Sequence, residues 1–359
     1  MELLKPGLNV VLDAQWGSTG KGKLCGWIGD QFKEKLAYVC SSFGPNAGHT
    51  FIGDDGQPVV FRHLPSSACT TDCPVLLMPD SVIEVNRLLD EIGFLRLKNR
   101  NREVYVHPRA AVIIPADQAA AAATGRHLAG TMKGTGHAMS RKMLRIEGTQ
   151  LAKDVLPHHM VADTCQLVRN SVKHGEYVLF EMSQGFDLSL NHGFEYPYLT
   201  SRDITIGAAI NSCGVSHKDV SRVIGSMRTF PIRVGNVEGG YSGPCHHDQE
   251  ELTWPGVTDL AGSPNQLREI TTVTKRVRRV FSFSFMQMLR FVEHNKPDWL
   301  FLNFAQYLDW KANEAKSVNA LGDTVLNFTR NLYDKLGVPI ALVGTGASNS
   351  HIVKLGTHE

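Results

Sequence analysis

The sequence predicts an α/β protein in which a largely parallel central sheet is flanked by helices. Short apolar runs bounded by turn residues alternate with amphipathic segments along most of the 359 residues. Such runs are typical of strands buried in a parallel sheet, and the amphipathic segments are typical of helices that cover its two faces. In addition, a glycine-rich loop directly follows the first apolar run, which is the order found in phosphate-binding folds.

Each expected element follows from this pattern. The apolar runs predict strands at residues 8–14, 75–78, 104–107, 177–181, 220–226, 299–302 and 340–344. The periodic segments predict helices at residues 24–35, 82–95, 116–126, 161–174 and 317–336. No repeat or linker divides the chain, so we expect a single domain over residues 1–359. Periodicity is lost at about residues 231–266, which predicts a long, flexible surface loop.

Composition argues against several classes of protein. Hydrophobic residues make up 42% of the chain and charged residues 20%, as in ordinary soluble globular proteins. A net charge of +2 offers no basic field for nucleic acid. No apolar run suits a membrane span or a secretory signal. Seven cysteines without a Cys-x-x-Cys pair indicate reduced thiols and a cytoplasmic location.

Residues 17–23, Gly-Ser-Thr-Gly-Lys-Gly-Lys, fit the phosphate-loop pattern Gly-x-x-x-x-Gly-Lys. Glycines let backbone N–H groups turn toward phosphate oxygens, and the following helix adds its positive N-terminal end. Leu24 stands where the usual pattern has the Ser or Thr that binds Mg²⁺, so the metal must be held elsewhere. The alternative, a strand-to-helix turn with chance glycines, is disfavoured by this context.

A second loop, Gly-Pro-Asn-Ala-Gly-His-Thr at residues 44–50, can offer a carbonyl to a metal and an imidazole to a reacting phosphate. Together the two loops resemble those of adenylosuccinate synthetase. Further segments agree with this family in order along the chain: residues 181–185, 192–201, 233–235, 273–279 and 344–346. The resemblance spans nearly the whole chain and implies the family's phosphate-loop-like nucleotide-binding fold.

The resemblance implies a ligase that joins L-aspartate to a 6-oxopurine nucleotide in two steps. A nucleoside triphosphate first phosphorylates the purine O6, and the aspartate amine then displaces that phosphate. Catalysis of this kind is mostly positioning and charge neutralisation. His49 would stabilise the phosphoryl group and the charge on O6, and Ser18 is the second catalytic position. The carbonyl of Gly48 and the hydroxyl of Ser18 would bind Mg²⁺.

The same resemblance assigns the residues that bind each small-molecule substrate. The triphosphate would contact Ser18, Thr19, Gly20, Lys21, Gly22, Lys23, Gly48, His49, Thr50, Arg278, Gln306, Gly344, Thr345 and Gly346. The purine nucleoside monophosphate would contact Ser18, Asn46, Ala47, Thr131, Arg145, Gln184, Thr200 and Arg276. Aspartate would contact Thr272, Val273, Thr274, Lys275, Arg276 and Arg278, since guanidinium forks suit carboxylates. Without the other motifs, this arginine run would be interpreted as a solvated basic face.

Arg145 matches an arginine that reaches into the second subunit of the family's dimer. The resemblance therefore implies a homodimer in which each subunit contributes this side chain to its partner's site. Neither nucleic acid nor a membrane is expected as a partner.

The glycine loop departs from the family at Ser18 and Thr19, which replace an Asp and a Glu. The family's Asp is the general base on purine N1 and a Mg²⁺ ligand, whereas a serine hydroxyl is a weaker, neutral ligand and no base at neutral pH. Serine is also shorter, which leaves space for a 2-amino group. The change resembles the phage-encoded 2-aminoadenylosuccinate synthetase branch, which condenses dGMP with aspartate on the way to the DNA base 2,6-diaminopurine. The general base stays unassigned.

Two further departures concern the other substrates. The family reads the guanine of GTP with a Lys-x-Asp motif, and the aligned residues here end in Gln306. Glutamine cannot accept from both guanine N1–H and N2–H, but its carboxamide suits the edge of adenine, so ATP or dATP is the expected donor. Lys275 replaces a glycine before the arginines, and the aspartate pocket is expected to differ in detail.

Two alternatives stay open at this stage. One is an adenylosuccinate synthetase that acts on IMP, and the other is a nucleotide-binding relative without catalysis, because the loop has lost its Asp. Residues 245–248, Cys-His-His-Asp, are interpreted as a polar surface loop, since adjacent histidines cannot easily bind one zinc ion. Glu181 and Asp187 are assigned no role.

Overall fold

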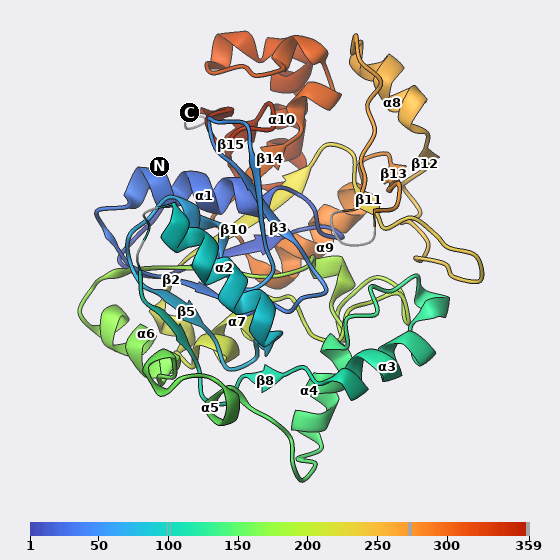
Figure 1. The fold of residues 1–359 in the computed structure, drawn as a ribbon. Coiled ribbons are helices and arrows are strands. Elements are labelled where there is room, and N and C mark those ends of the chain that lie inside the picture. The colour runs from blue at the N-terminus through green and yellow to red at the C-terminus, as the bar shows by residue number, and fades with distance from the viewer. Residues whose placement is uncertain (99, 101, 272–274, 357–359) are drawn as a thin grey trace.

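The computed structural model describes residues 1–98, 100, 102–271 and 275–356. A nine-stranded sheet forms its centre, in the order β16-β15-β14-β10-β1-β9-β2-β5-β7 (Figure 1). The strands are β1 (Gly7–Asp13), β2 (Leu36–Ser41), β5 (Val75–Leu77), β7 (Val104–Val106), β9 (Tyr177–Glu181), β10 (Val220–Arg228), β14 (Trp299–Asn303), β15 (Ile340–Gly344) and β16 (Ile352–Lys354). Neighbouring strands are parallel except β15 and β16. The predicted α/β class with a largely parallel sheet is confirmed.

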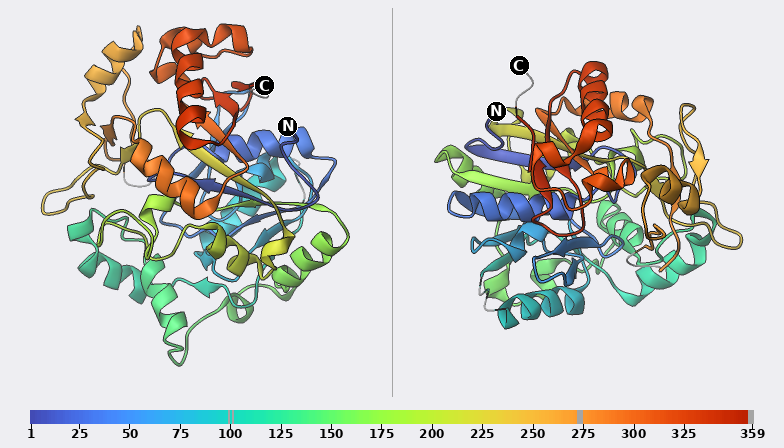
Figure 2. Two further views of the ribbon diagram at one scale, coloured as in Figure 1. Left: turned by 180° about the vertical axis from the view of Figure 1, so that it is seen from behind. Right: turned by 90° about the horizontal axis from the view of Figure 1, so that it is seen from above.

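Helices cover both faces of this sheet (Figure 2). They are α1 (Lys21–Phe32), α2 (Val85–Leu97), α3 (Pro115–Thr124), α4 (Thr135–Met143), α5 (Ala152–Val155), α6 (Thr164–Lys173), α7 (Ile206–Cys213), α8 (Trp254–Ala261), α9 (Phe285–Asn295) and α10 (Gly322–Leu336). Side chains of β1 alternate between two cores. Val11 packs in the core that contains α1 and α2, whereas Val10 and Leu12 pack in the core that contains α6, α7, α9 and α10. This is why apolar residues occupy successive positions from Val10 to Leu12.

Three small sheets complete the fold. Strands β3 (His49–Ile52) and β4 (Pro58–Phe61) form a hairpin, and β6 (Val82–Ile83) pairs with β8 (Ala111–Val112). Strands β11 (Ile232–Arg233), β13 (Arg279–Phe281) and β12 (Glu251–Leu252) form the third. In the described part of the chain, we find no helix that is both long and apolar enough to cross a bilayer.

The segment 231–266 is more ordered than the predicted long loop. It includes β11, β12 and α8, and the irregular parts are mainly residues 234–250 and 262–266. The Thr253 hydroxyl accepts from the N–H of Gly256 and starts α8, which buries Trp254, Val257 and Ala261. Periodicity is hard to recognise in an eight-residue helix, so the loss of pattern predicted a loop here wrongly.

The connections that build the site leave the sheet at one edge. The glycine loop follows β1, Gln184 follows β9, Thr229 follows β10, and Phe304 follows β14. These are adjacent parallel strands, so their carboxyl ends lie together, which is where open α/β sheets bind ligands.

Candidate active site

The glycine loop is shaped from within by Asp13, the last residue of β1. Its buried carboxylate accepts from the N–H groups of Gln15 at 3.0 Å, Gly17 at 3.1 Å and Thr19 at 3.3 Å. These N–H groups therefore point into the protein. The predicted phosphate contacts therefore fall on the N-terminus of α1. This helix begins directly after Gly20, whose backbone is left-handed with φ 92°. A helix N-terminus is a ready site for phosphate oxygens.

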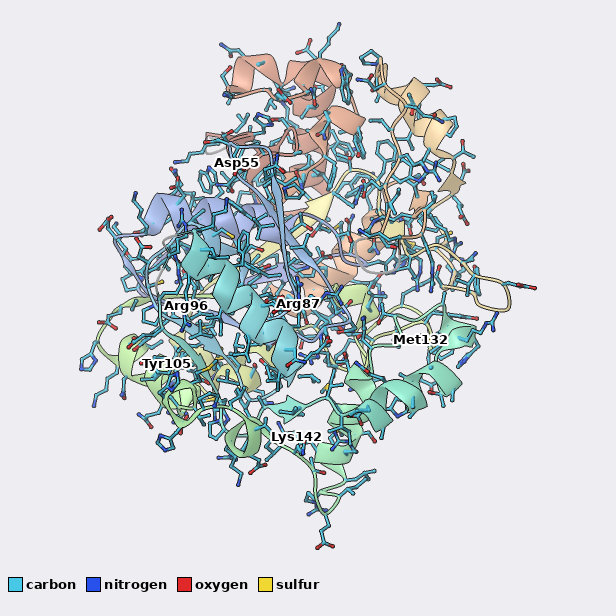
Figure 3. All side chains as sticks on the ribbon, in the orientation of Figure 1. Asp55, Arg87, Arg96, Tyr105, Met132 and Lys142 are labelled. Atoms are coloured by element: carbon cyan, nitrogen blue, oxygen red, sulfur yellow. The ribbon has the colours of Figure 1, made fainter. Side chains whose placement is uncertain are left out.

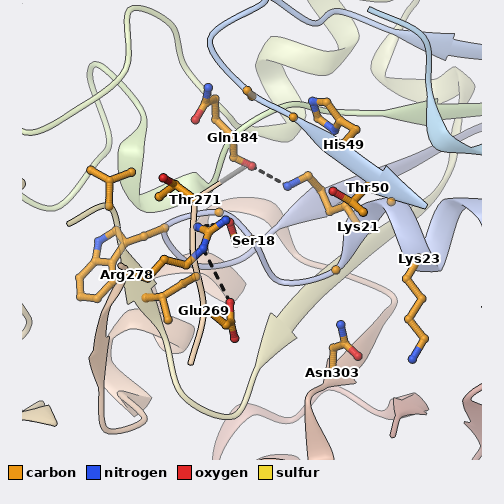
Figure 4. Close-up of a pocket in the computed structure, with 18 of the residues that line it drawn as sticks. Ser18, Lys21, Lys23, His49, Thr50, Gln184, Glu269, Thr271, Arg278 and Asn303 are labelled. Atoms are coloured by element: carbon orange, nitrogen blue, oxygen red, sulfur yellow. Dashed lines mark hydrogen bonds and ion pairs between the residues drawn. The ribbon is translucent and has the colours of Figure 1, made fainter. Parts of the chain in front are cut away.

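The two lysines of the loop point in different directions (Figure 4). The Lys21 ammonium donates to Asp13 at 3.0 Å and to the carbonyl of Gln184 at 2.8 Å. The Lys23 ammonium instead donates to the carbonyls of Gly346 and His351, both at 2.7 Å. Lys21 thus lies at the centre of the site, whereas Lys23 fastens the loop after β15 to α1.

Lys23 makes the stability of the protein depend on pH. Burial lowers the pKa of its ammonium to about 7, from the value of 10.5 that describes the unfolded chain. Between these pH values the unfolded chain binds the Lys23 proton more tightly, so the free energy of unfolding should rise with pH across this window. Lys23→Met should flatten that rise in denaturant unfolding measured from pH 7 to 10. An unchanged slope in the variant would contradict this assignment.

His49 is fixed in plane and in orientation. Its ring stacks on Phe43 with centroids 3.4 Å apart and 3° between the planes, and Nδ1 lies 3.1 Å from Oε1 of Glu181. Nε2 is buried and has no hydrogen-bond partner among the described residues. Burial lowers the pKa of His49, against the opposing effect of the Glu181 carboxylate. Nε2 is therefore the ring nitrogen left for a substrate.

Glu181, which the sequence left without a role, is the hydrogen-bond partner of His49. Its other oxygen accepts from the N–H of Ser66 at 2.8 Å, so the carboxylate is held from both sides. Glu181→Gln should lower kcat by about 10- to 100-fold, as loss of a histidine's carboxylate partner does elsewhere. The KM values of all substrates should change little, because the binding residues keep their places. Steady-state kinetics checks this, and a loss confined to KM would refute the orienting role.

Ser18 lies next to Arg278, the second arginine of the predicted aspartate site (Figure 4). Nη1 of Arg278 donates to its hydroxyl oxygen at 2.8 Å. Arg278 in turn lies 3.7 Å from the carboxylate of Glu269, which also pairs with Arg228. Arg228 is fully buried and donates to the carbonyl of Ser18 at 3.0 Å. The backbone and the side chain of Ser18 are thus both fixed by one arginine–glutamate cluster.

Two cavities with some wall residues in common lie in this region. The first, of about 360 Å³, contains most of the predicted triphosphate contacts: Ser18, Gly20, Lys21, Gly22, Lys23, Gly48, His49, Thr50, Arg278 and Gly346. The second, of about 320 Å³, is lined by Met132, which Figure 3 labels just before α4, and by Thr200. Asn46, Thr131 and Gln184 line both. The two cavities are therefore neighbours, and from the predicted contacts we call the first the donor cavity and the second the acceptor cavity.

Several predicted residues lie outside these walls. The hydroxyl of Thr19 donates to Asp13 at 2.6 Å, and that of Thr345 donates to the carbonyl of Ala315 at 2.8 Å. Arg276 donates to the carbonyl of Ala129 at 2.9 Å. Gln306 is buried two residues beyond Phe304, which does line the donor cavity. Gly344, Lys275 and Arg145 also line neither cavity. Thr272, Val273 and Thr274 lie outside the described residues.

The 245–248 segment matches the predicted polar surface loop in part, because His247 and Asp248 are exposed whereas His246 is buried. His246 is buried between the rings of Trp16 and Phe194, and its Nε2 lies 2.5 Å from the buried carboxylate of Asp187. Asp248 accepts from the Ser284 hydroxyl and from the N–H of Met286 at the start of α9. The segment therefore anchors the irregular connection beside the glycine loop.

Comparison with known proteins agrees with this geometry. A family model described as adenylosuccinate synthetase matches residues 10–155 and 147–311. The chain belongs to the adenylosuccinate synthetase family. The predicted family is confirmed, and since members of this family are named as synthetases, the protein is an enzyme of the carbon–nitrogen ligase type.

The chain is similar to phage members of the family. It is 38% identical to the N6-succino-2-amino-2'-deoxyadenylate synthase of Cyanophage S-2L, over 83% of this chain and 82% of the relative. The enzyme of that name from Vibrio phage phiVC8 is 37% identical, over 84% and 86%. The adenylosuccinate synthetase of Thermococcus sibiricus is 29% identical, over 96% and 98%. The predicted resemblance to the phage branch is thereby confirmed.

Solved structures give the same result. The Cyanophage S-2L succinoaminodeoxyadenylate synthetase, bound to dGMP and to dATP as an energy donor, matches with a TM-score of 0.82 and 34% identity, over 98% of this chain and 96% of that chain. Adenylosuccinate synthetase from Plasmodium falciparum matches with a TM-score of 0.81 at 18% identity and supports the fold alone.

Proposed function

We propose that the protein condenses dGMP with L-aspartate, with ATP or dATP as phosphoryl donor and Mg²⁺ as cofactor. The reaction passes through a 6-phosphoryl intermediate and gives 2-amino-2'-deoxy-N6-succinyladenylate, the nucleoside diphosphate and phosphate. The observation that carries this proposal is Ser18, a short neutral residue that lines the first cavity and accepts a hydrogen bond from Arg278. It leaves room for the 2-amino group of guanine where the family has a carboxylate.

The described residues divide the work between the two steps. The acceptor lies across the two cavities, with its purine near Ser18, His49 and Gln184 and its phosphate in the cavity that Thr131 and Thr200 line. Purine O6 attacks the γ-phosphorus, and Lys21 neutralises charge on the transferring group. His49 adds to this when Nε2 is protonated, a form that the Glu181 carboxylate favours. The aspartate amine then attacks C6 and phosphate leaves. Arg276 and Arg278 bind the aspartate carboxylates.

Magnesium suits the oxygen atoms of the donor cavity. The carbonyl of Gly48 and the hydroxyl of Ser18 belong to the same cavity wall, and both are hard ligands of the kind that Mg²⁺ prefers alongside phosphate oxygens. Asp13 is not available to it, since five hydrogen bonds already use its carboxylate. When bound, Mg²⁺ neutralises the β- and γ-phosphates and orients them for transfer.

An adenine donor is supported by Gln306. Its carboxamide is buried, and Oε1 has no hydrogen-bond partner in the described part of the chain. It lies behind Phe304 in the donor wall, so accepting from the amino group of adenine requires Phe304 to move aside. The dATP reported in the Cyanophage S-2L structure agrees with this choice.

A homodimer is supported by the surroundings of Arg145. It stands in a turn after α4 with φ 54°, next to the exposed side chains of Met143, Leu144 and Ile146. An exposed apolar group of this kind around one arginine suits a subunit contact that places Arg145 in the partner's acceptor site.

The test compares acceptors directly. Purified protein, ATP, Mg²⁺ and aspartate are mixed with dGMP, GMP or IMP, phosphate release is followed, and the product is identified by its mass. We expect release with dGMP and a product that contains one aspartate. Turnover with IMP alone would establish an adenylosuccinate synthetase, and triphosphate binding without turnover of any acceptor would establish a non-catalytic relative.

A further inference from the structure

We infer that Asp13 is a positioning residue for the phosphoryl transfer. It anchors the Lys21 ammonium so that this charge bridges the glycine loop and the acceptor segment at Gln184. The inference rests on the proposed function and extends it to a residue that lines neither cavity.

The carboxylate of Asp13 is fully used by the loop that follows it. Oδ1 accepts from the N–H groups of Gln15 and Gly17, and Oδ2 accepts from the N–H and the hydroxyl of Thr19 and from Lys21. The side chain is completely buried. It has no capacity left for substrate or metal, so it can act only through the groups that it holds.

Lys21 carries the effect of Asp13 to the acceptor. Its second hydrogen bond, of 2.8 Å, goes to the carbonyl of Gln184, a non-glycine residue with φ 61°. The next residue, Gly185, packs so tightly on the glycine loop that a Cβ there would lie 2.2 Å from the carbonyl oxygen of Gln15. The left-handed turn at Gln184 is therefore held from the loop side, by Lys21 and by this packing. The position of the Gln184 side chain relative to the Lys21 ammonium is therefore fixed.

The charges predict an unusual pair of effects. Lys21 and Asp13 are both buried and form an ion pair, so the lysine charge is partly compensated in the free enzyme. Without the carboxylate, the ammonium would be free to follow the triphosphate alone, and its charge would attract phosphate more strongly. It would at the same time lose its fixed place beside Gln184. Loss of Asp13 should thus preserve or strengthen triphosphate binding while it slows the reaction.

The experiment uses Asp13→Asn in the full chain. A matched control is Glu91→Gln, because Glu91 is also buried and accepts from three backbone N–H groups, at Arg62, His63 and Leu64, and from the side chain of Arg87. For Asp13→Asn we expect kcat with dGMP to fall about 100-fold, as misplacement of a reacting group does. The triphosphate Kd should stay equal or decrease, and the aspartate KM should stay within about 3-fold. Glu91→Gln should keep kcat within about 3-fold.

A double variant covers the case in which Asp13→Asn does not fold. Asp13→Asn/Lys21→Met removes both members of the buried pair and leaves no uncompensated charge. If Asp13 acts through Lys21, its kcat should equal that of Lys21→Met alone. A further loss in the double variant would overturn the inference. So would a kcat in Asp13→Asn equal to that of Glu91→Gln, or a loss of kcat matched by weaker triphosphate binding.

The experiments distinguish failure of the inference from failure of the proposed function. If the unmodified enzyme turns over none of dGMP, GMP and IMP, the proposed function fails. The comparison of triphosphate Kd between Asp13→Asn and the unmodified enzyme still tests the inference in that case. If dGMP is turned over but the variant shows none of the expected changes, only the role of Asp13 fails.

Discussion

Ser18→Asp is expected to lower kcat/KM for dGMP by about 10- to 100-fold, because overfilling a packed site costs about 1–3 kcal/mol. The Ser18 hydroxyl already accepts a hydrogen bond from Nη1 of Arg278 at 2.8 Å. A larger side chain therefore has to extend toward the acceptor base. The purine edge that carries the 2-amino group of guanine would then meet the new carboxylate. IMP has no such group, and the carboxylate would supply the base that the loop lacks, so turnover with IMP should appear.

A matched variant separates size from charge. Ser18→Asn adds almost the same volume without a carboxylate. It should impair dGMP to a similar extent, and it should not gain IMP turnover, because a carboxamide is no base. Steady-state rates with each acceptor at saturating ATP and aspartate give both answers. Unchanged dGMP turnover in Ser18→Asp would refute the steric argument.

His49→Asn is expected to lower kcat by about 100- to 1,000-fold, the usual range for loss of one group that stabilises charge in the transition state. Glu181 fixes the imidazole through Nδ1, and Phe43 stacks on the ring. Nε2 is therefore the nitrogen left for the reacting group. Asparagine keeps a polar atom near Glu181 but removes Nε2. The KM values for dGMP and ATP should change by less than about 5-fold, since other residues bind them.

His63→Asn is the control for this variant. His63 is equally buried and lies in a neighbouring loop, where its Nε2 accepts from the N–H of Glu84. It lines neither cavity. Its loss should reduce thermal stability and leave kcat within about 3-fold. If both histidine variants lose activity in proportion to their loss of stability, the catalytic role of His49 is not supported.

Much of the fold could be predicted because it depends on local pattern. Parallel strands buried on two faces, such as β1 and β9, read as continuous apolar runs. The glycine loop was recognisable for the same reason, since its pattern is contiguous. Strand β2 was missed, and its pairing with β9 shifts register between Leu36 and Tyr38. The hairpin β3–β4 was missed because both strands are short and half-buried.

The missed parts of the site depend on contacts between distant residues. Glu181 acquires its role from His49, which lies 132 residues earlier in the chain. Lys23 looks like a phosphate ligand in the sequence, yet its carbonyl partners lie more than 320 residues away. Asp187 and His246 are likewise joined only by the fold. Asp13 is different, because its partners are local, but an acid at the end of a strand has no distinctive sequence signature.

The most direct test of the central claim is a crystal structure of the enzyme grown with equal concentrations of dGMP and IMP. We expect guanine in the acceptor cavity, with its 2-amino group next to Ser18 and its phosphate near Thr131 and Thr200. Hypoxanthine in that place, or guanine with its 2-amino group turned away from Ser18, would contradict the assignment of dGMP as the acceptor.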